Sequence, residues 1–143
     1  LYNNLDYSFT VGHENGTSVQ PPKTPGGGNP GFRRQMKVLA EFLRSFDFVR
    51  MKPDASVIRA GLPANGRRQA LVETGRQYAI YLKGQPLSPV VVELPRGTYR
   101  AEWINVITGH ADARLELVHP GGPATLKPPA GAEEIALRLR GRP

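Results

Sequence analysis

Alternation of apolar and more polar side chains over three consecutive stretches is the feature that most constrains this chain. The stretches are residues 77–82, 90–94 and 98–103, separated by Gly84-Gln85-Pro86 and Pro95-Arg96-Gly97. Side chains of a β-strand point to opposite faces with a period of two, so each stretch offers one apolar face. Proline presets φ and glycine tolerates positive φ, as tight turns require. The pattern predicts successive strands of one sheet packed on another, an architecture typical of modules that bind or brace.

Further strand patterns recur at short intervals on both sides of these stretches. They are predicted at Val57 to Ala60, Gln69 to Glu73, Arg114 to Val118, Ala124 to Lys127 and Glu134 to Arg140. After Trp103 the apolar residues Ile104 and Val106 come one position late, which predicts a bulge or a strand that passes from one sheet to the other. The fold class is therefore mainly β, an antiparallel β-sandwich of jelly-roll or immunoglobulin-like type.

The first fifty residues follow different periods. Apolar residues spaced four, three, four and three predict an amphipathic helix over residues 31–46, namely Phe32, Met36, Leu39, Leu43 and Phe46. Leu5 to Val11 alternates as a strand that ends at Gly12, and residues 17–30, rich in proline and glycine, predict a long loop. One βα unit cannot pair its own strand, so we expect it to be the end of a larger domain. We expect the apolar stripe to be largely buried, against that domain or against the sandwich.

Composition limits the remaining functions. The 143 residues suffice for one domain, or for a small domain with a fragment of another, and the absence of cysteine excludes disulfides and thiolate chemistry. No apolar stretch is long enough to span a membrane, so no membrane partner is expected. The three histidines lack metal-ligand spacing, and Gly26-Gly27-Gly28 lacks the lysine of a phosphate loop. We expect no metal, no cofactor and no catalytic triad.

The formal charge of +7 favours an anionic partner only if the basic residues gather on one face. The candidates for a basic patch near one edge, attractive to uronic-acid polysaccharide or nucleic acid, are Arg67, Arg68, Arg138, Arg140 and Arg142. No nucleic-acid-binding motif accompanies them, so we expect no nucleic-acid partner and favour a solvated surface. Charged edge residues also discourage sheet-to-sheet aggregation.

Exposed aromatic rings would be needed for stacking on sugars. Tyr99 and Trp103 share the apolar face of their strand and are predicted to lie in the core. Tyr81 alternates with Ile80 and Leu82, which puts it on the opposite face from them. Tyr81 is therefore the candidate for contact with a polysaccharide.

Several segments together resemble a known arrangement in bacterial glycoside-hydrolase-like proteins. In these proteins a (β/α)8 barrel similar to apiosidase-type enzymes precedes a C-terminal module classed as the collagen-binding domain of a collagenase. The segments that resemble the junction are Asn4 to Gly12, Pro25 to Gly28, Arg34 to Lys37 and Ser45 to Asp54. Those that resemble the module are Gln77 to Leu82, Gly97 to Trp103 and Thr108-Gly109. The resemblance implies that residues 1–51 are the terminal strand, loop and helix of a barrel, and that residues 52–143 form an accessory sandwich.

The resemblance also implies a function. The module would brace the barrel without catalysing and would bind polysaccharide, while the catalytic carboxylates of a glycoside hydrolase would lie upstream of Leu1. His13 and Glu14 follow the predicted strand end, where barrel active sites gather, and are candidates for substrate contact. A polar turn around Asn15-Gly16 is the simpler interpretation. The alternatives are a piece of an active glycoside hydrolase and a collagen- or matrix-binding module, and the implied location is secreted or periplasmic.

Overall fold

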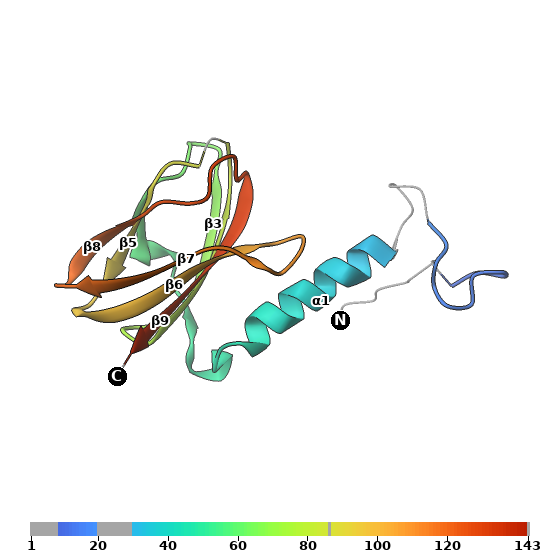
Figure 1. Ribbon diagram of the computed structural model, residues 1–143, viewed down its shortest axis with the longest axis horizontal. Coiled ribbons are helices and arrows are strands. Elements are labelled where there is room, and N and C mark those ends of the chain that lie inside the picture. The colour runs from blue at the N-terminus through green and yellow to red at the C-terminus, as the bar shows by residue number, and fades with distance from the viewer. Residues whose placement is uncertain (1–8, 20–29, 86, 143) are drawn as a thin grey trace.

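A helix and two antiparallel sheets make up the part of the chain that the structure describes. The computed structural model describes residues 9–19, 30–85 and 87–142. The helix α1 (Pro30–Arg44) comes first and the strands follow in two layers (Figure 1). The predicted fold class, mainly β with an antiparallel sandwich, is confirmed.

Six strands form the larger sheet and three form the smaller one. The larger sheet has the order β1-β3-β4-β9-β6-β7, and the smaller sheet has the order β2-β5-β8. The strands of the larger sheet are β1 (Lys52–Pro53), β3 (Arg67–Glu73), β4 (Gln77–Lys83), β9 (Glu134–Arg142), β6 (Gly97–Asn105) and β7 (Ala111–His119). Those of the smaller sheet are β2 (Ile58–Ala60), β5 (Val90–Leu94) and β8 (Gly122–Leu126), and two short 3-10 helices are η1 (Phe48–Arg50) and η2 (Ala55–Val57).

The core lies between the two sheets and is built around three aromatic residues. Tyr78, Tyr99 and Trp103 are all buried, and the Tyr78 and Tyr99 rings meet edge to face at 6.4 Å. The Tyr99 hydroxyl donates to the Pro95 carbonyl at 2.9 Å, and the Tyr78 hydroxyl accepts from the Gly75 N–H at 2.8 Å. Buried hydroxyls are thus satisfied at the rim of the core, as burial of tyrosine requires. The predicted core positions of Tyr99 and Trp103 are confirmed.

All eight strands predicted for the sandwich are present, and one further strand was not predicted. That strand, β1, has two residues, one of them Pro53, so it carries no readable alternation and lies at an edge where a missing N–H is tolerated. The predicted bulge is also found. The register of β6 with β7 shifts between Trp103 and Ile104, while the register of β6 with β9 continues unbroken. Strand β6 therefore stays in the larger sheet, and Ile104 lies on the face opposite Trp103.

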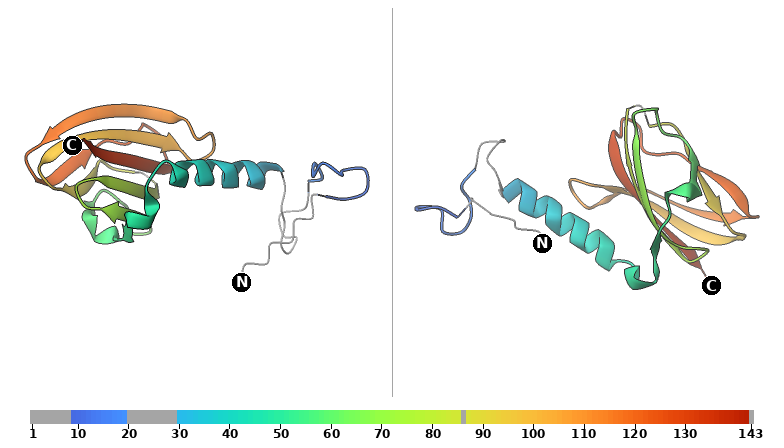
Figure 2. Two further views of the ribbon diagram at one scale, coloured as in Figure 1. Left: turned by 90° about the horizontal axis from the view of Figure 1, so that it is seen from below. Right: turned by 180° about the vertical axis from the view of Figure 1, so that it is seen from behind.

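The helix agrees with the predicted one but ends two residues earlier. Its last turn closes on Ser45, whose N–H donates to the carbonyls of Glu41 and Phe42, both at 3.2 Å. The predicted first strand lies largely outside the described residues. Within them Thr10 makes only an isolated bridge to His13, and residues 20–29 of the predicted loop are not described. Figures 1 and 2 show α1 extending away from the sandwich, with only its C-terminal end close to the sheet.

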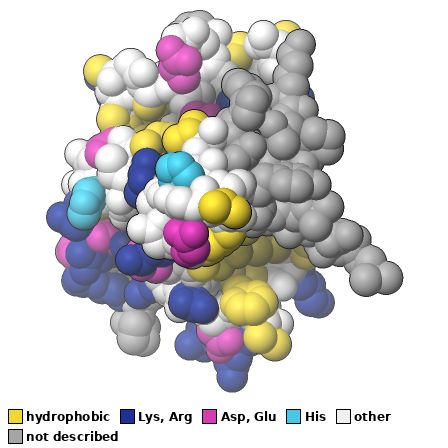
Figure 3. All heavy atoms as spheres, turned by 90° about the vertical axis from the view of Figure 1, so that its right-hand side faces the viewer, with side chains coloured by type: hydrophobic (Ala, Val, Ile, Leu, Met, Phe, Trp, Pro, Cys, Tyr) yellow, Lys and Arg dark blue, Asp and Glu magenta, His cyan; other side chains and the backbone are white. Residues whose placement is uncertain are grey.

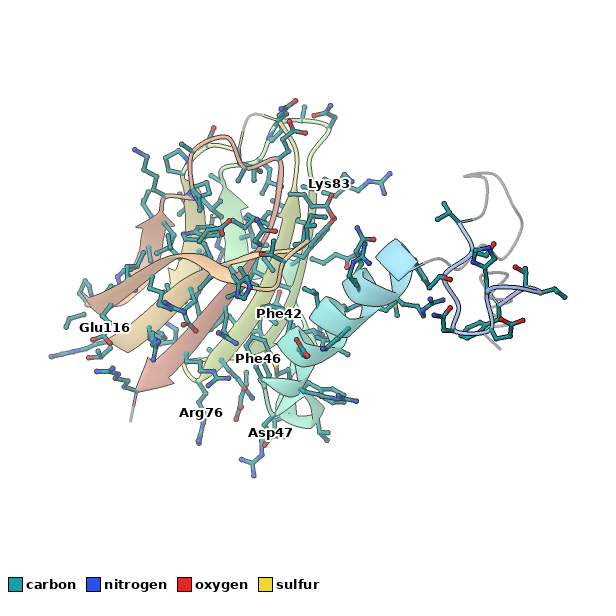
Figure 4. The ribbon with its side chains drawn as sticks, turned by 45° about the vertical axis from the view of Figure 1, so that its right-hand side comes forward. Phe42, Phe46, Asp47, Arg76, Lys83 and Glu116 are labelled. Carbon is teal, nitrogen blue, oxygen red and sulfur yellow. The ribbon has the colours of Figure 1, made fainter. Side chains whose placement is uncertain are left out.

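The junction between α1 and the larger sheet is held by one buried amide. The Gln77 side chain donates to the Asp47 carbonyl at 3.0 Å and accepts from the Asp47 N–H at 3.1 Å. Beside it, Phe46 and Met51 are buried against the sheet, and the Arg140 guanidinium lies 5.8 Å from the centre of the Phe46 ring and donates to the Ser45 carbonyl. Figure 4 shows Phe42 and Phe46 between α1 and the sheet, with Asp47 at the end of the helix. The Gln77 amide thus satisfies the N–H and the carbonyl of Asp47, as the backbone of a neighbouring strand would.

Replacing this amide tests the junction. Gln77→Ala leaves both backbone groups of Asp47 without their partner, so we expect the free energy of unfolding to fall by about 1–2 kcal/mol. Hydrogen exchange should accelerate at residues 45–51 more than in β4. Gln69→Ala is the matched control, because Gln69 is exposed on the same face of the adjacent strand β3. Equal effects of the two substitutions on residues 45–51 would contradict this role of Gln77.

Candidate functional site

An apolar groove between α1 and the outer face of the larger sheet is the candidate site. Its volume is about 710 Å³. Val38, Leu39 and Phe42 line it from the helix, and Leu71, Ile104 and Ala136 line it from strands β3, β6 and β9. Figure 3 views the molecule from the helix end, where hydrophobic side chains reach the surface among charged ones.

The strand register places apolar residues side by side under the helix. Leu71 pairs with Ala79, and Ile104 pairs with Ala136, so these four outward-facing positions lie on neighbouring strands. The two alanines are small, which leaves room between the sheet and the larger side chains of α1. An outer sheet face is usually polar in a sandwich that is wet on one side. The exception here marks the area over which the helix lies.

The helix fills only part of this area. Met36 and Leu39, two members of the predicted apolar stripe, are each 48% exposed, whereas Phe46 is 7% exposed. The expectation that the stripe would be largely buried is therefore met only at the C-terminal end of α1. The reason is geometric, because a straight helix touches the twisted sheet near one end and then leaves it (Figure 2).

The turn between β6 and β7 approaches the middle of α1. Gly109 has a φ of +77°, and a Cβ atom at this position would lie 3.4 Å from both γ-carbons of Val38. The turn is held by the Asn105 side-chain carbonyl, which accepts the N–H groups of Ile107 at 3.0 Å and Thr108 at 3.1 Å. A glycine here satisfies both the backbone conformation and the close approach.

Tyr81 lines the groove from β4, on the face opposite the core as predicted. Its hydroxyl donates to Glu134 at 2.6 Å, and the other oxygen of Glu134 accepts from Lys83 at 2.9 Å. Burial, followed by the hydrogen bond and the charge of Glu134, raises the pKa of Tyr81 to about 12, against the opposing charge of Arg67. The hydrogen bond from Tyr81 and that from Lys83 lower the pKa of Glu134. Contact of Tyr81 with a substrate stays a prediction.

His13 and Glu14 lie in an exposed turn beyond the N-terminal end of α1 (Figures 1 and 2). The His13 N–H donates to the Thr10 carbonyl at 2.8 Å, and its Nδ1 lies 3.0 Å from the Thr17 hydroxyl. Glu14 accepts the Gly12 N–H at 2.9 Å, and this bond lowers the pKa of its carboxyl. The structure thus describes a polar turn, and it does not bring these residues to the groove. Their contact with a substrate also stays a prediction.

Neither a metal centre nor a membrane span emerges from the described residues. No group of three or more His, Asp or Glu side chains in residues 9–19, 30–85 and 87–142 could hold a metal ion. In the same ranges no helix is long and apolar enough to cross a membrane.

Sequence reasoning missed the groove itself. Leu71 and Ala79 are apolar residues at positions that alternation assigns to the solvent face. Single exceptions of this kind do not by themselves indicate a buried surface. The signal that could have found the area is Ile104, whose apolar side chain comes one position out of phase. Together with the half of the helix stripe that lies above it, Ile104 marks a second apolar surface outside the core.

Solved structures with a similar fold include two glycoside hydrolases, while no protein-family model and no curated protein matches the chain. A glycoside hydrolase of family 5 from Bacteroides vulgatus matches 78% of this chain with a TM-score of 0.62 and 18% identity. A second structure, of a glycoside hydrolase, matches 90% with a TM-score of 0.61 and 17% identity. The match covers only 25% and 32% of those two chains, respectively. The likeness shows that this fold occurs as a segment of larger hydrolases; the resemblance to a collagen-binding module stays a prediction.

The raised pKa of Tyr81 makes a prediction for alkaline conditions. A phenol whose pKa is higher in the folded state stabilises the fold fully below its unfolded pKa of about 10 and loses this effect as the pH rises toward 12. Tyr81→Phe should therefore lower the free energy of unfolding by about 1 kcal/mol at pH 8, and the deficit should shrink between pH 10 and pH 12. Urea unfolding of both proteins across this range measures it.

The two proteins differ only in the Tyr81 hydroxyl, so the difference between their stabilities isolates the phenol. Glu134→Gln serves as the second variant. It removes the acceptor charge and should move the absorbance titration of Tyr81 toward pH 10. A Tyr81→Phe deficit that is constant from pH 8 to pH 12 would show that the phenol is not held as described.

Proposed function

We propose that this chain is a non-catalytic accessory module of a glycoside-hydrolase-like protein, and that it braces a (β/α)8 barrel through α1 and the apolar groove. The observation that carries the proposal is the half-exposed apolar stripe of α1. Met36 and Leu39 have no cover from the described residues sufficient to bury them. A barrel helix packed against the stripe would bury both.

This chain leaves apolar surface of α1 in water. Full burial of a Leu or Met side chain stabilises by about 1.5–3 kcal/mol relative to exposure. An amphipathic helix gains most of its stability from such packing, and not from helix propensity. The 15-residue helix is buried against the sandwich only near its C-terminal end, and the β6–β7 turn approaches it at Val38, so the helix is incompletely packed. The proposed division, with residues 1–51 belonging to the barrel and residues 52–143 to the sandwich, supplies the missing partner.

The junction at Asp47 would make the brace rigid. The Gln77 amide, the buried Phe46 ring and the Arg140 guanidinium all act on residues 45–47, where a flexible linker would otherwise lie. A helix that is part of the barrel would thus fix the orientation of the sandwich. This supports a bracing role over that of a freely tethered module.

The acidic groups of the described residues support a non-catalytic role. The buried carboxylate among them is Glu102. Burial favours its neutral form, but hydrogen bonds from Arg114 and Arg138, with the charges of Arg138 and Arg100, outweigh burial and lower its pKa. A glycosidase general acid needs a raised pKa. Hydrolysis of glycosides by the complete protein, and its export from the cell, belong to the same proposal and would depend on the barrel.

A comparison of the same substitution in two contexts tests the bracing role. Met36→Gln with Leu39→Gln keeps helix propensity nearly constant while removing the apolar stripe. We expect the double variant to lower the free energy of unfolding of the complete polypeptide by about 2–4 kcal/mol, and that of this chain alone by much less. Chemical unfolding of both proteins, followed by tryptophan fluorescence and circular dichroism, gives the two values.

The control is Lys37→Gln, on the solvent face of the same helix, where Lys37 pairs with Glu41 at 3.7 Å. It should cost little in either context. Equal costs of the double variant in the two contexts would contradict the brace. Hydrolysis of aryl glycosides by this chain alone would contradict the non-catalytic role, and retention on collagen but not on polysaccharide would favour the matrix-binding alternative.

A further inference from the structure

Five arginines occupy the outer face of the larger sheet beyond the C-terminal end of α1. We call them the arginine array: Arg100, Arg114, Arg138, Arg140 and Arg142. The sequence offered three of them, with Arg67 and Arg68, as candidates for a basic patch, although it favoured a solvated surface. The structure places Arg67 opposite Lys83, at the other end of the sheet from the three arginines of β9. Strand β9 lies inside the sheet between β4 and β6, so its arginines meet those of β6 and β7 instead. Figure 3 shows Lys and Arg side chains gathered at its left, with Asp and Glu among them.

The strand register sets the array out in rows. Arg138 lies opposite Glu102, and Arg140 lies opposite Arg100. On the other side of β6, Arg114 lies opposite Glu102. Neighbouring strands are about 4.8 Å apart, so the array spans three strands over about 10 Å. Arg142, one step further along β9, extends it toward the C-terminal end of the strand.

Glu102 organises the centre of the array. It is 7% exposed, and it accepts from Arg138 at 2.8 Å, Arg114 at 3.0 Å and Arg100 at 3.2 Å. Arg114 and Arg138 reach it through Nε, which leaves both Nη groups of each without a partner among the described residues. Free pairs of Nη groups are the part of a guanidinium that binds a carboxylate or sulfate in a forked manner.

The array has more positive charge than its own acids neutralise. Five arginines face Glu102 and Glu116, of which Glu116 binds Arg142 at 2.6 Å, so three positive charges remain. The pKa of Arg140 is lowered in part by this excess of positive charge. Burial lowers its pKa first, and the charges of Arg138 and Arg100 lower it further, against the attraction of Glu102. Like charges held this close favour an added anion.

We propose that the arginine array is a binding site for acidic polysaccharide, whose carboxylate or sulfate groups pair with the free Nη groups of Arg114 and Arg138 and with Arg142. Glu102 acts as a template that holds the guanidinium groups at fixed positions on three strands. The array lies on the outer face of a sheet, across which a long chain can lie. Its ligand is recognised by repeated charge, not by enclosure.

The choice of polysaccharide among polyanions rests on the proposed function as part of a glycoside-hydrolase-like protein. One independent feature also favours it over nucleic acid. Single-stranded nucleic acid is bound by basic grooves in which aromatic rings stack on the bases. The array occupies residues 98–102 of β6, 114–118 of β7 and 138–142 of β9. None of the outward-facing side chains in these three ranges is aromatic. The nearby Phe46 ring is buried. The surface thus offers charge without stacking.

Binding of defined polymers to this chain tests the inference. The probes are polygalacturonate, heparin, fully methyl-esterified polygalacturonate and a single-stranded DNA oligonucleotide, measured by calorimetry at two salt concentrations. Arg114→Gln with Arg142→Gln removes two half-exposed members and leaves Arg100 and Arg138 on Glu102. We expect this double variant to raise the Kd for a charged polysaccharide tenfold or more, with the fold confirmed by circular dichroism.

Arg59→Gln with Arg67→Gln is the matched control. Both arginines are exposed, Arg59 on the smaller sheet and Arg67 opposite Lys83 at the other end of the larger sheet, so the net charge changes equally but away from the array. We expect less than a twofold change in Kd. Preference for polygalacturonate identifies carboxylate as the recognised group, and preference for heparin identifies sulfate.

Three outcomes would overturn the inference: equal losses in the two double variants, undiminished binding of the methyl-esterified polymer, or tighter binding of DNA than of either charged polysaccharide. None of these outcomes contradicts the bracing role if the Met36→Gln, Leu39→Gln variant destabilises the complete polypeptide more than this chain alone. Conversely, equal destabilisation in the two contexts, together with binding that depends on the array, would overturn only the proposed function.

Discussion

The larger sheet must bury both of its faces at one end and only one face at the other, and the rest of the structure depends on this constraint. Inward-facing residues such as Tyr78 and Trp103 fill the sandwich core. On the opposite face the helix needs a dry surface near β3 and β4, and water covers the remainder. The Gln77 amide lies between these two areas and fixes the loop from α1 to the sheet by its hydrogen bonds to the backbone of Asp47. Because the amide accepts from the N–H and donates to the carbonyl of the same residue, it fixes the orientation of Asp47 as well as its position.

The strands could be predicted because their signal is local. Alternation within a run of residues reports which side chains share a face, and the runs that form β4, β5, β6 and β9 are clear in this respect. The order of the strands is not local. Strand β9 enters between β4 and β6, and only this places Arg138 beside Glu102. Pairing of residues 36 positions apart cannot be read from spacing, so the sequence could not show which of its candidate arginines lie together.

The groove escaped prediction for a related reason. Alternation assumes one buried face, and it treats an apolar residue on the other face as noise. Ile104 and Ala136 break the rule in different strands, and only their pairing makes the breaks coherent. The helix stripe was readable, but its partner was not, since the chain from Phe46 to Met51 decides which end of α1 touches the sheet. Buried Phe46 and half-exposed Leu39 on one stripe are the result.

The groove and the arginine array adjoin each other along a single strand. On β9, Ala136 lines the groove, Arg138 binds Glu102 two residues later, and Arg140 then covers Phe46 at the end of the helix. A partner that covers the stripe of α1 would therefore approach the array without needing to lie on it, because the outward positions change from apolar to basic within one step of the strand. Burial of the groove would also exclude water from one side of the array, which strengthens the pairing of its guanidinium groups with anions. The groove and the arginine array thus lie next to each other on β9. An anion bound by Arg138 would lie beside the junction between α1 and the sandwich.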